Sequence, residues 1–222
     1  MVANIFNWFK KESLENIQVP IDLNEIRKRA RILFIDDEDV PQIKILIAEG
    51  FSIEHWKDIE NNLNKLESGD YDIIFLDIAG VGERYSREGA IGILKDIKKC
   101  NPAVIVIAFS GQKFDIEQTK FFKLADDVLK KDAGPLEIKT KIEEFLKEKF
   151  SVTFYWGKIK DFLKNQKISE SKINKAEKVL YKSIAKRDHK FFNNWAKKIF
   201  TDEISIKTLT ALASKLIEIF AK

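Results

Sequence analysis

The chain has 222 residues, of which 45% are hydrophobic and 33% are charged, and its net charge is +4. This composition predicts an ordered, helix-rich soluble protein with room for one full core and a second, smaller one. The longest apolar run, residues 103–109, is too short to span a bilayer, the N-terminus lacks a secretory signal pattern, and a single cysteine excludes an internal disulfide. These features favour a cytoplasmic protein without membrane insertion.

Charge divides the chain into two parts. Residues 151–222 hold sixteen Lys and Arg against seven Asp and Glu, a balance of +9, which leaves −5 of the total of +4 for residues 1–150. The two parts are electrostatically different, and this difference predicts separate domains.

Residues 1–29 form a leader in front of the first predicted strand. Apolar residues at positions 5, 6, 8 and 9 predict a short amphipathic helix, and a linker that contains Pro20 follows. Docking of this helix on the rest of the protein or on a partner is the favoured interpretation, because anchoring at a membrane surface would need a longer helix.

From residue 30 to residue 150, short apolar runs alternate with helical patterns. Strands are predicted at residues 30–36, 51–56, 71–77, 103–110 and 126–129. Helices are predicted at residues 40–49, 57–67, 88–99, 115–124 and 135–149. Strands that are buried on both faces and alternate with helices imply a parallel sheet in a three-layer α/β sandwich.

Polar residues follow the predicted strands at their carboxyl ends. Asp36 and Asp37 end the first strand, Asp77 ends the third, Ser110 ends the fourth, and two lysines follow the fifth. Ligands of open α/β sheets bind at these strand ends. Neighbouring carboxylates repel one another unless a cation lies between them, and Mg²⁺ prefers oxygen ligands of this kind. The alternative, that the acids only cap turns or helices, is disfavoured by their register on successive strands.

The order of these motifs resembles the receiver domain of two-component response regulators. The resemblance covers residues 30–150 and rests on DDE at 36–38, Asp77, Ser110 and ADDVLKK at 125–131. It implies a doubly wound five-stranded parallel sheet with the strand order 2-1-3-4-5.

The resemblance also implies a phosphoryl-transfer site. Asp77 would take a phosphoryl group from a histidine kinase, a phosphotransfer protein or a small phosphodonor, in a reaction that the domain catalyses on itself without being an enzyme in the usual sense. Ser110 would donate a hydrogen bond to one phosphoryl oxygen, and Lys131, which the ADDVLKK motif favours over Lys130, would pair with another. Positioning and charge neutralisation account for most of the catalysis in such a transfer.

A magnesium site belongs to the same implication. Asp37 would bind Mg²⁺ directly and Asp36 partly through water, while Asp77 and the backbone carbonyl of Ala79 would complete the protein ligands.

Several features depart from the family pattern. Residues 78–89 (IAGVGERYSREG) form a longer segment than the family leads us to expect, and it contains Arg84 and Arg87. We interpret it either as a gate or kinase contact or as a tolerated surface loop. Val128 stands where most receivers carry an aromatic switch residue, and Asp132 replaces the usual proline, so no cis peptide is expected there. His55 and His189 lack metal-ligand spacing and are interpreted as packing or surface residues.

Residues 151–222 show helical periodicity throughout and predict a small helical bundle that serves as the output domain. Helices are predicted at residues 154–165, 169–187, 189–200 and 202–221, with Ser169 and Thr201 as N-caps. The lysines lie where the solvated face of a bundle is expected, and Arg187 is the only arginine of this part. A protein partner, such as the acidic domain or a second copy of the chain in a homodimer, is therefore favoured over nucleic acid.

The sequence thus predicts a receiver-type phosphorylation switch joined to a basic helical output domain. Two alternatives stay open. One is a pseudo-receiver scaffold that works without phosphorylation, and the other is a nucleic-acid-binding regulator that uses the basic tail.

Overall fold

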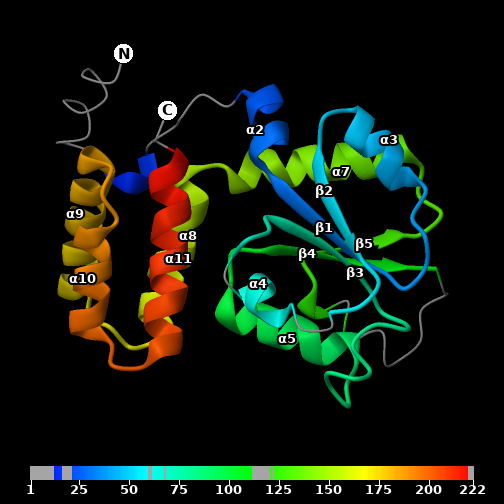
Figure 1. The fold of residues 1–222 in the computed structure, drawn as a ribbon. Helices are drawn as coiled ribbons and strands as arrows, with labels where there is room; N and C mark the ends of the chain where they lie inside the picture. Colours follow the sequence, from blue (N-terminus) through cyan, green and yellow to red (C-terminus); the bar gives the residue numbers. More distant parts are fainter. Residues whose placement is uncertain are drawn as a thin grey trace. The chain divides into compact units, whose positions relative to one another are not determined.

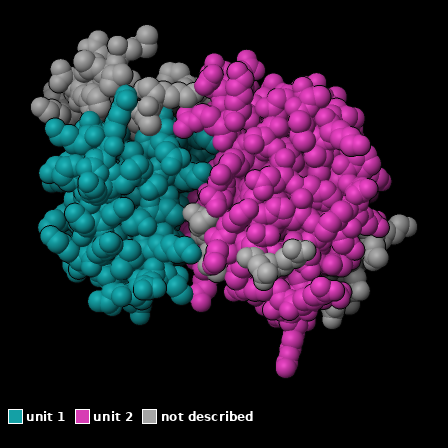
Figure 2. Space-filling model, viewed as in Figure 1, with its two compact units in different colours: residues 1–21, 148–222 teal, residues 22–147 magenta. Residues whose placement is uncertain are grey.

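The structure, a computed structural model, describes residues 13–16, 22–59, 62–67, 69–111, 121 and 123–219 (Figure 1). The chain divides into two compact units (Figure 2). Residues 22–147 form the first, called here the α/β unit, and the N-terminal segment together with residues 148–222 forms the second, called here the helical unit.

A five-stranded parallel sheet forms the centre of the α/β unit, in the order β2-β1-β3-β4-β5. Its strands are β1 (Arg31–Ile35), β2 (Ser52–Trp56), β3 (Ile73–Asp77), β4 (Ile105–Ser110) and β5 (Asp127–Lys130). The predicted fold class and strand order are therefore confirmed. Because all five strands run in parallel, their carboxyl ends meet at one edge of the sheet.

Helices cover both faces of this sheet. They are α2 (Leu23–Arg29), α3 (Gln42–Ala48), α4 (Leu63–Glu67), α5 (Ala90–Cys100) and α7 (Pro135–Lys149). Figure 1 shows α4 and α5 on one face and α3 and α7 on the other. Residues 112–120 and 122, which include most of the helix predicted at 115–124, lie outside the described residues, as does the predicted helix at residues 5–9.

Side chains alternate between the two faces of the sheet, as the pleat requires. On the face of α5, residues such as Leu33, Ile74 and Val106 pack with Ile93 and Ile97. On the other face three rings gather, from Phe34, Phe75 and Phe109. The rings of Phe34 and Phe75 stack with centroids 4.2 Å apart, and Phe109 meets both rings edge-on. All of these side chains are buried, so the sheet is rigid beneath the edge where the polar residues gather.

One predicted helix of the α/β unit begins later than expected, and one further helix was not predicted. The helix predicted at 57–67 begins only at Leu63, because Asp58 uses its Oδ1 atom to accept the N–H groups of Ile59 and Gly82, at 2.8 and 2.9 Å, and this turns the chain. The predicted linker contains the additional helix α2. Its N-cap is Asp22, which accepts hydrogen bonds from the N–H groups at positions 24 and 25.

The helical unit consists of η1 (Leu14–Asn16), α8 (Val152–Asn165), α9 (Glu170–Lys186), α10 (Lys190–Ile199) and α11 (Glu203–Ile219). Helix α8 packs against α11, α9 against α10, and α10 against α11. Fully buried residues such as Trp156, Leu180, Phe192 and Leu216 form its core, as expected for a bundle. None of the described helices is long and apolar enough to cross a membrane.

Helix caps of this unit agree with the prediction in part. Ser169 lies at the N-cap of α9 but makes no capping hydrogen bond. Asp202, and not Thr201, caps α11, because its Oδ1 atom accepts the N–H of Ser205 at 2.7 Å. Ser151 caps α8 by accepting the N–H of Phe154.

Candidate functional site

Three carboxylates meet at the carboxyl edge of the sheet. Asp36 and Asp37 follow β1, and Asp77 is the last residue of the neighbouring strand β3. One oxygen atom from each of the three lies within 4.8 Å of the others. Asp36 and Asp77 are only 1% and 3% exposed, whereas Asp37 is exposed to solvent.

Lys131, just beyond β5, brings a positive charge to these acids. Its Nζ atom donates hydrogen bonds to Asp77 Oδ2 at 2.8 Å, Asp36 Oδ1 at 2.9 Å and Glu38 Oε2 at 3.4 Å. Gln42 of α3 donates from its Nε2 atom to the carbonyl of Lys131 and so fixes the chain that carries the lysine. The preceding Lys130 is exposed and lies outside this cluster.

Burial and hydrogen bonding shift the pKa values of Asp77 and Lys131 in opposite directions. Burial raises the pKa of the Asp77 carboxyl, and the hydrogen bonds from Lys131 and from the Ala79 N–H offset this only in part. Burial alone would lower the pKa of Lys131, but its hydrogen bonds to Asp77 and Asp36 raise that pKa above its usual range. The lysine therefore keeps its charge, and one ammonium faces several acids.

The site fits a hard divalent cation on two observations. Its donors are carboxylate oxygens, which such ions prefer, and the Asp36 Oδ2 atom is buried without a hydrogen-bond partner among the described residues. A buried oxygen without a partner is costly, and a cation or its water would satisfy it.

A cavity of about 320 Å³ opens in front of this cluster. Its lining holds five of the six residues that the sequence singles out, and the sixth, Asp36, is buried and joins it through the hydrogen bond to Lys131. The lining consists of Asp37, Glu38, Asp77, Ala79, Gly80, Ser110, Gly111 and Lys131. Strand ends from β1, β3, β4 and β5 thus contribute to one cavity.

Three residues of the site were missed by sequence reasoning. Glu38 lines the cavity and hydrogen-bonds Lys131, and its only signal in the sequence is its place directly after the two aspartates. Gly80 has φ +75° and approaches Asp37 so closely that a Cβ atom there would lie 2.5 Å from Asp37 Oδ2. His55 is half-buried on β2, with Nε2 3.0 Å from the carbonyl oxygen of Asp36, so it braces the backbone of the site.

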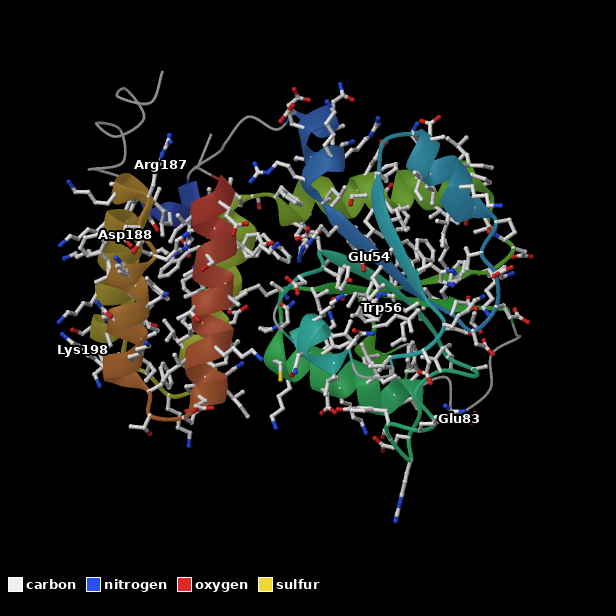
Figure 3. All side chains as sticks on the ribbon, in the orientation of Figure 1. Glu54, Trp56, Glu83, Arg187, Asp188 and Lys198 are labelled. Atoms are coloured by element: carbon white, nitrogen blue, oxygen red, sulfur yellow. The ribbon has the colours of Figure 1, made fainter. Side chains whose placement is uncertain are left out.

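The longer segment 78–89 lies beside the cavity, and two residues in its middle hold it to the rest of the unit. Its Gly82 N–H bonds to Asp58, and its Tyr85 hydroxyl donates to Asp96 Oδ2 of α5 at 2.8 Å. Glu83, marked in Figure 3, is exposed, as are Arg84 and Arg87 of the same segment. The segment therefore presents charged side chains of both signs to solvent.

The other departures have simple structural counterparts. Val128 is half-buried on β5 and packs against the core on the α5 face. The described residues contain no cis peptide bond, in line with the expectation for Asp132.

Comparisons with known proteins concern the α/β unit. No protein-family model matches the sequence, and no curated protein matches it either. Among solved structures, the chain is similar to a CheY-like response regulator receiver domain protein from Methanospirillum hungatei, with 23% identity over 54% of this chain and 95% of that one, and a TM-score of 0.47. It is also similar to a two-component response regulator from Clostridium difficile, with 23% identity over 53% of this chain and 96% of that one, and a TM-score of 0.45. A third similar structure is NtrX from Brucella abortus, with 25% identity over 54% of this chain and 27% of that one, and a TM-score of 0.46.

The α/β unit has the receiver fold. The strand order of its own sheet, 2-1-3-4-5, is that of a receiver. The matches to receiver domains cover about half of the chain and leave the helical unit unassigned.

Proposed function

We propose that the α/β unit is a phosphorylation switch in which Asp77 accepts a phosphoryl group in a Mg²⁺-dependent reaction. The observation that supports this most is the Asp77 carboxylate itself, which lies at the cavity wall, 2.8 Å from the Lys131 ammonium and within a cluster of three acids. A buried acid with a raised pKa in a cavity is a candidate functional group.

The chain's own residues supply the nucleophile and two groups that orient the phosphoryl group. A carboxylate oxygen of Asp77 forms a bond to phosphorus while the bond from phosphorus to the donor atom breaks, and the donor leaves with that electron pair. Lys131 then exchanges its bond to Asp77 for one to a phosphoryl oxygen, and the Ser110 hydroxyl donates to another. The product is an acyl phosphate on the protein, so the unit acts as a switch and not as an enzyme with a released product.

Asp36, Asp37 and Asp77 would hold Mg²⁺ together with the carbonyl of Ala79. When bound, the ion neutralises negative charge on the phosphoryl oxygens beside these carboxylates. The donor of the phosphoryl group would be a histidine kinase, a phosphotransfer protein or a small phosphodonor, and the helical unit would carry the output.

Labelling tests the assignment directly. Incubated with acetyl phosphate and Mg²⁺, the protein should gain one acid-labile phosphoryl group, measured by intact mass. Labelling should be lost in Asp77→Asn and after chelation of the metal. The matched control is Asp39→Asn, which removes an exposed acid that pairs with Lys57 outside the cavity and should leave labelling unchanged.

Two outcomes would contradict the proposal. Equal labelling of Asp77→Asn would mean that another residue is the acceptor. A folded wild-type protein that takes up no phosphoryl group would instead favour the pseudo-receiver scaffold.

A further inference from the structure

Five lysines lie along one side of α9, all of them exposed: Lys172, Lys175, Lys178, Lys182 and Lys186. At 3.6 residues per turn they fall within an arc of about 120°, and they extend over about 21 Å of the helix axis. The acids of α9, Glu170 and Glu177, fall on the other side of the helix. This segregation makes a continuous positive stripe.

Helix α10, which packs beside α9, adds three exposed lysines and no acid: Lys190, Lys197 and Lys198. The two helices are tied together by the Phe192 N–H, which donates to Ser183 Oγ, and by the Lys182 ammonium, 4.3 Å from the centre of the Phe191 ring. Lys198 is labelled on α10 in Figure 3, where side-chain nitrogens line this helix pair. These eight lysines are called the lysine face below.

Little negative charge compensates this face. Residues 170–199 hold nine Lys and Arg against three Asp and Glu. Of these acids, Glu177 accepts hydrogen bonds from Ser13 and Leu14, and Asp188 accepts the backbone N–H of Lys190. None of the eight ammonium groups forms an ion pair with a carboxylate of the described residues. A polyanion would therefore meet ammonium groups that need not first leave a carboxylate of the described residues.

The surroundings of the lysine face disfavour a membrane or a protein as its partner. A helix that lies in a membrane surface needs a free apolar side, but the apolar sides of α9 and α10 are buried in the bundle, and no large apolar residue of either helix is exposed. The centres of protein interfaces are depleted in lysine and enriched in aromatic residues and arginine. The lysine face has the opposite composition.

We propose that the lysine face binds the phosphate backbone of double-stranded nucleic acid without reading its sequence. Lysines neutralise the charge of phosphate groups, and such contacts position a protein on the duplex without reading its bases. A stripe of about 21 Å is long enough to pass about six phosphates of one strand. Single strands are usually held by exposed aromatic rings, whereas the aromatic residues of α9 and α10 are buried or half-buried. This inference differs from the protein partner favoured by the sequence, where the lysines lie on the expected solvated face and Arg187 is the only arginine of residues 151–222. The structure gathers eight of the lysines on one helix pair.

The test uses the full-length protein and fluorescence anisotropy with random-sequence duplex DNA of about 20 base pairs over a range of salt concentrations. Duplex RNA, single-stranded DNA of the same length and vesicles that contain phosphatidylserine are the comparison probes. The triple variant Lys172→Gln, Lys175→Gln, Lys186→Gln removes three charges from the stripe and spares Lys182, which holds α10. The matched control, Lys164→Gln, Lys167→Gln, Lys207→Gln, removes three exposed lysines elsewhere in the helical unit.

The stripe variant should bind duplex DNA or RNA at least tenfold more weakly, and the slope of log affinity against log salt should fall by about 2 to 3, close to 0.9 for each phosphate contact. The control should change affinity less than about threefold, with the same circular dichroism spectrum and melting temperature as the wild type. Duplex DNA and duplex RNA both present a phosphate backbone to the lysine face. Their relative affinities show which of the two the protein binds more tightly.

Four results would overturn the proposal: no duplex binding at low salt, equal losses in the two triple variants, tenfold tighter binding of the single strand, or binding to vesicles without binding to duplex. The inference concerns the helical unit and does not rest on phosphoryl transfer. Asp77→Asn should therefore keep its basal duplex binding, so failure of the one proposal is distinguishable from failure of the other.

Discussion

Gly80 shows how a single residue shapes the acidic site. Its φ of +75° lies in the left-handed region, and any side chain would collide with Asp37, whose Oδ2 would be 2.5 Å from the added Cβ atom. Gly80→Ala should therefore displace Asp37 from the cluster and weaken Mg²⁺ binding by at least about tenfold, measured by isothermal titration calorimetry.

Gly50 provides the matched control for this change. It also has a positive φ, +93°, but nothing lies within 4 Å of the Cβ that alanine would add. Both variants should lose about 1–2 kcal/mol of stability through the backbone, and only Gly80→Ala should lose affinity for the metal. If Gly80→Ala binds Mg²⁺ as the wild type does, the position of Asp37 does not determine binding.

Tyr71 is the residue whose protonation the fold changes in a way that a pH titration can follow. Burial, and then the hydrogen bond of 2.6 Å that its hydroxyl donates to Glu54 Oε2, raise the pKa of Tyr71 above its usual range. A raised pKa means that the folded state favours the neutral phenol. This contribution to stability is complete below the unfolded pKa of about 10 and is lost as the pH rises through the folded pKa.

Tyr71 should therefore ionise above the usual range of a tyrosine. Ultraviolet difference absorbance of tyrosinate should show that Tyr71→Phe removes a step above the ordinary tyrosine pKa of about 10. The same variant should lose stability less steeply at alkaline pH than the wild type. Loss of an early step instead would mean that the buried hydrogen bond to Glu54 does not hold the proton.

Some residues of the acidic site could be predicted from the sequence, and others could not. Asp36, Asp77 and Lys131 were predictable because a strand end positions each of them, and strands are visible in the sequence as apolar runs. Gly80 and His55 were not, since their contacts with the backbone and side chains of residues 36 and 37 depend on how a loop and a neighbouring strand are placed in space.

At the scale of elements, the strands and the four C-terminal helices were predictable to within a few residues, whereas elements set by a distant hydrogen bond were not. Residues 57–62 have a helical pattern, but Asp58 binds the N–H of Gly82, which lies 24 residues away, and no local periodicity contains that contact. Helix α2 carries a local signal after all. Asp22 and Glu25 stand three apart, as in a capping box, although only Ile26 of this helix is buried.

At the scale of the whole molecule, the N-terminal segment and the C-terminal helices belong to one unit, although the sequence predicted them as separate parts. Glu177 Oε1 accepts hydrogen bonds of 2.8 Å from Ser13 Oγ and from the Leu14 N–H, a separation of 163 residues in the second case. Leu14 is fully buried, and the Thr153 hydroxyl donates to the Glu15 carbonyl. The helical unit is therefore built from both ends of the chain, and a tail cut at residue 151 lacks part of its own core.

This construction predicts that the two units respond to different changes. Leu14→Ala removes a fully buried side chain and should destabilise the helical unit by about 2–5 kcal/mol. Mg²⁺ bound at the proposed site should stabilise the α/β unit, by about 2.7 kcal/mol at a hundredfold excess over its dissociation constant, because the unfolded chain has no such site. Calorimetry should then resolve two transitions, one lowered by Leu14→Ala and the other raised by the ion.

Leu136→Ala is the matched control, since this leucine is 75% exposed and its loss should leave both transitions within about 0.5 kcal/mol. A single transition that moves with both the ion and Leu14→Ala would show that the units unfold as one cooperative body. In that case binding at the acidic site would also stabilise the lysine face, and the two sites would be coupled through stability alone.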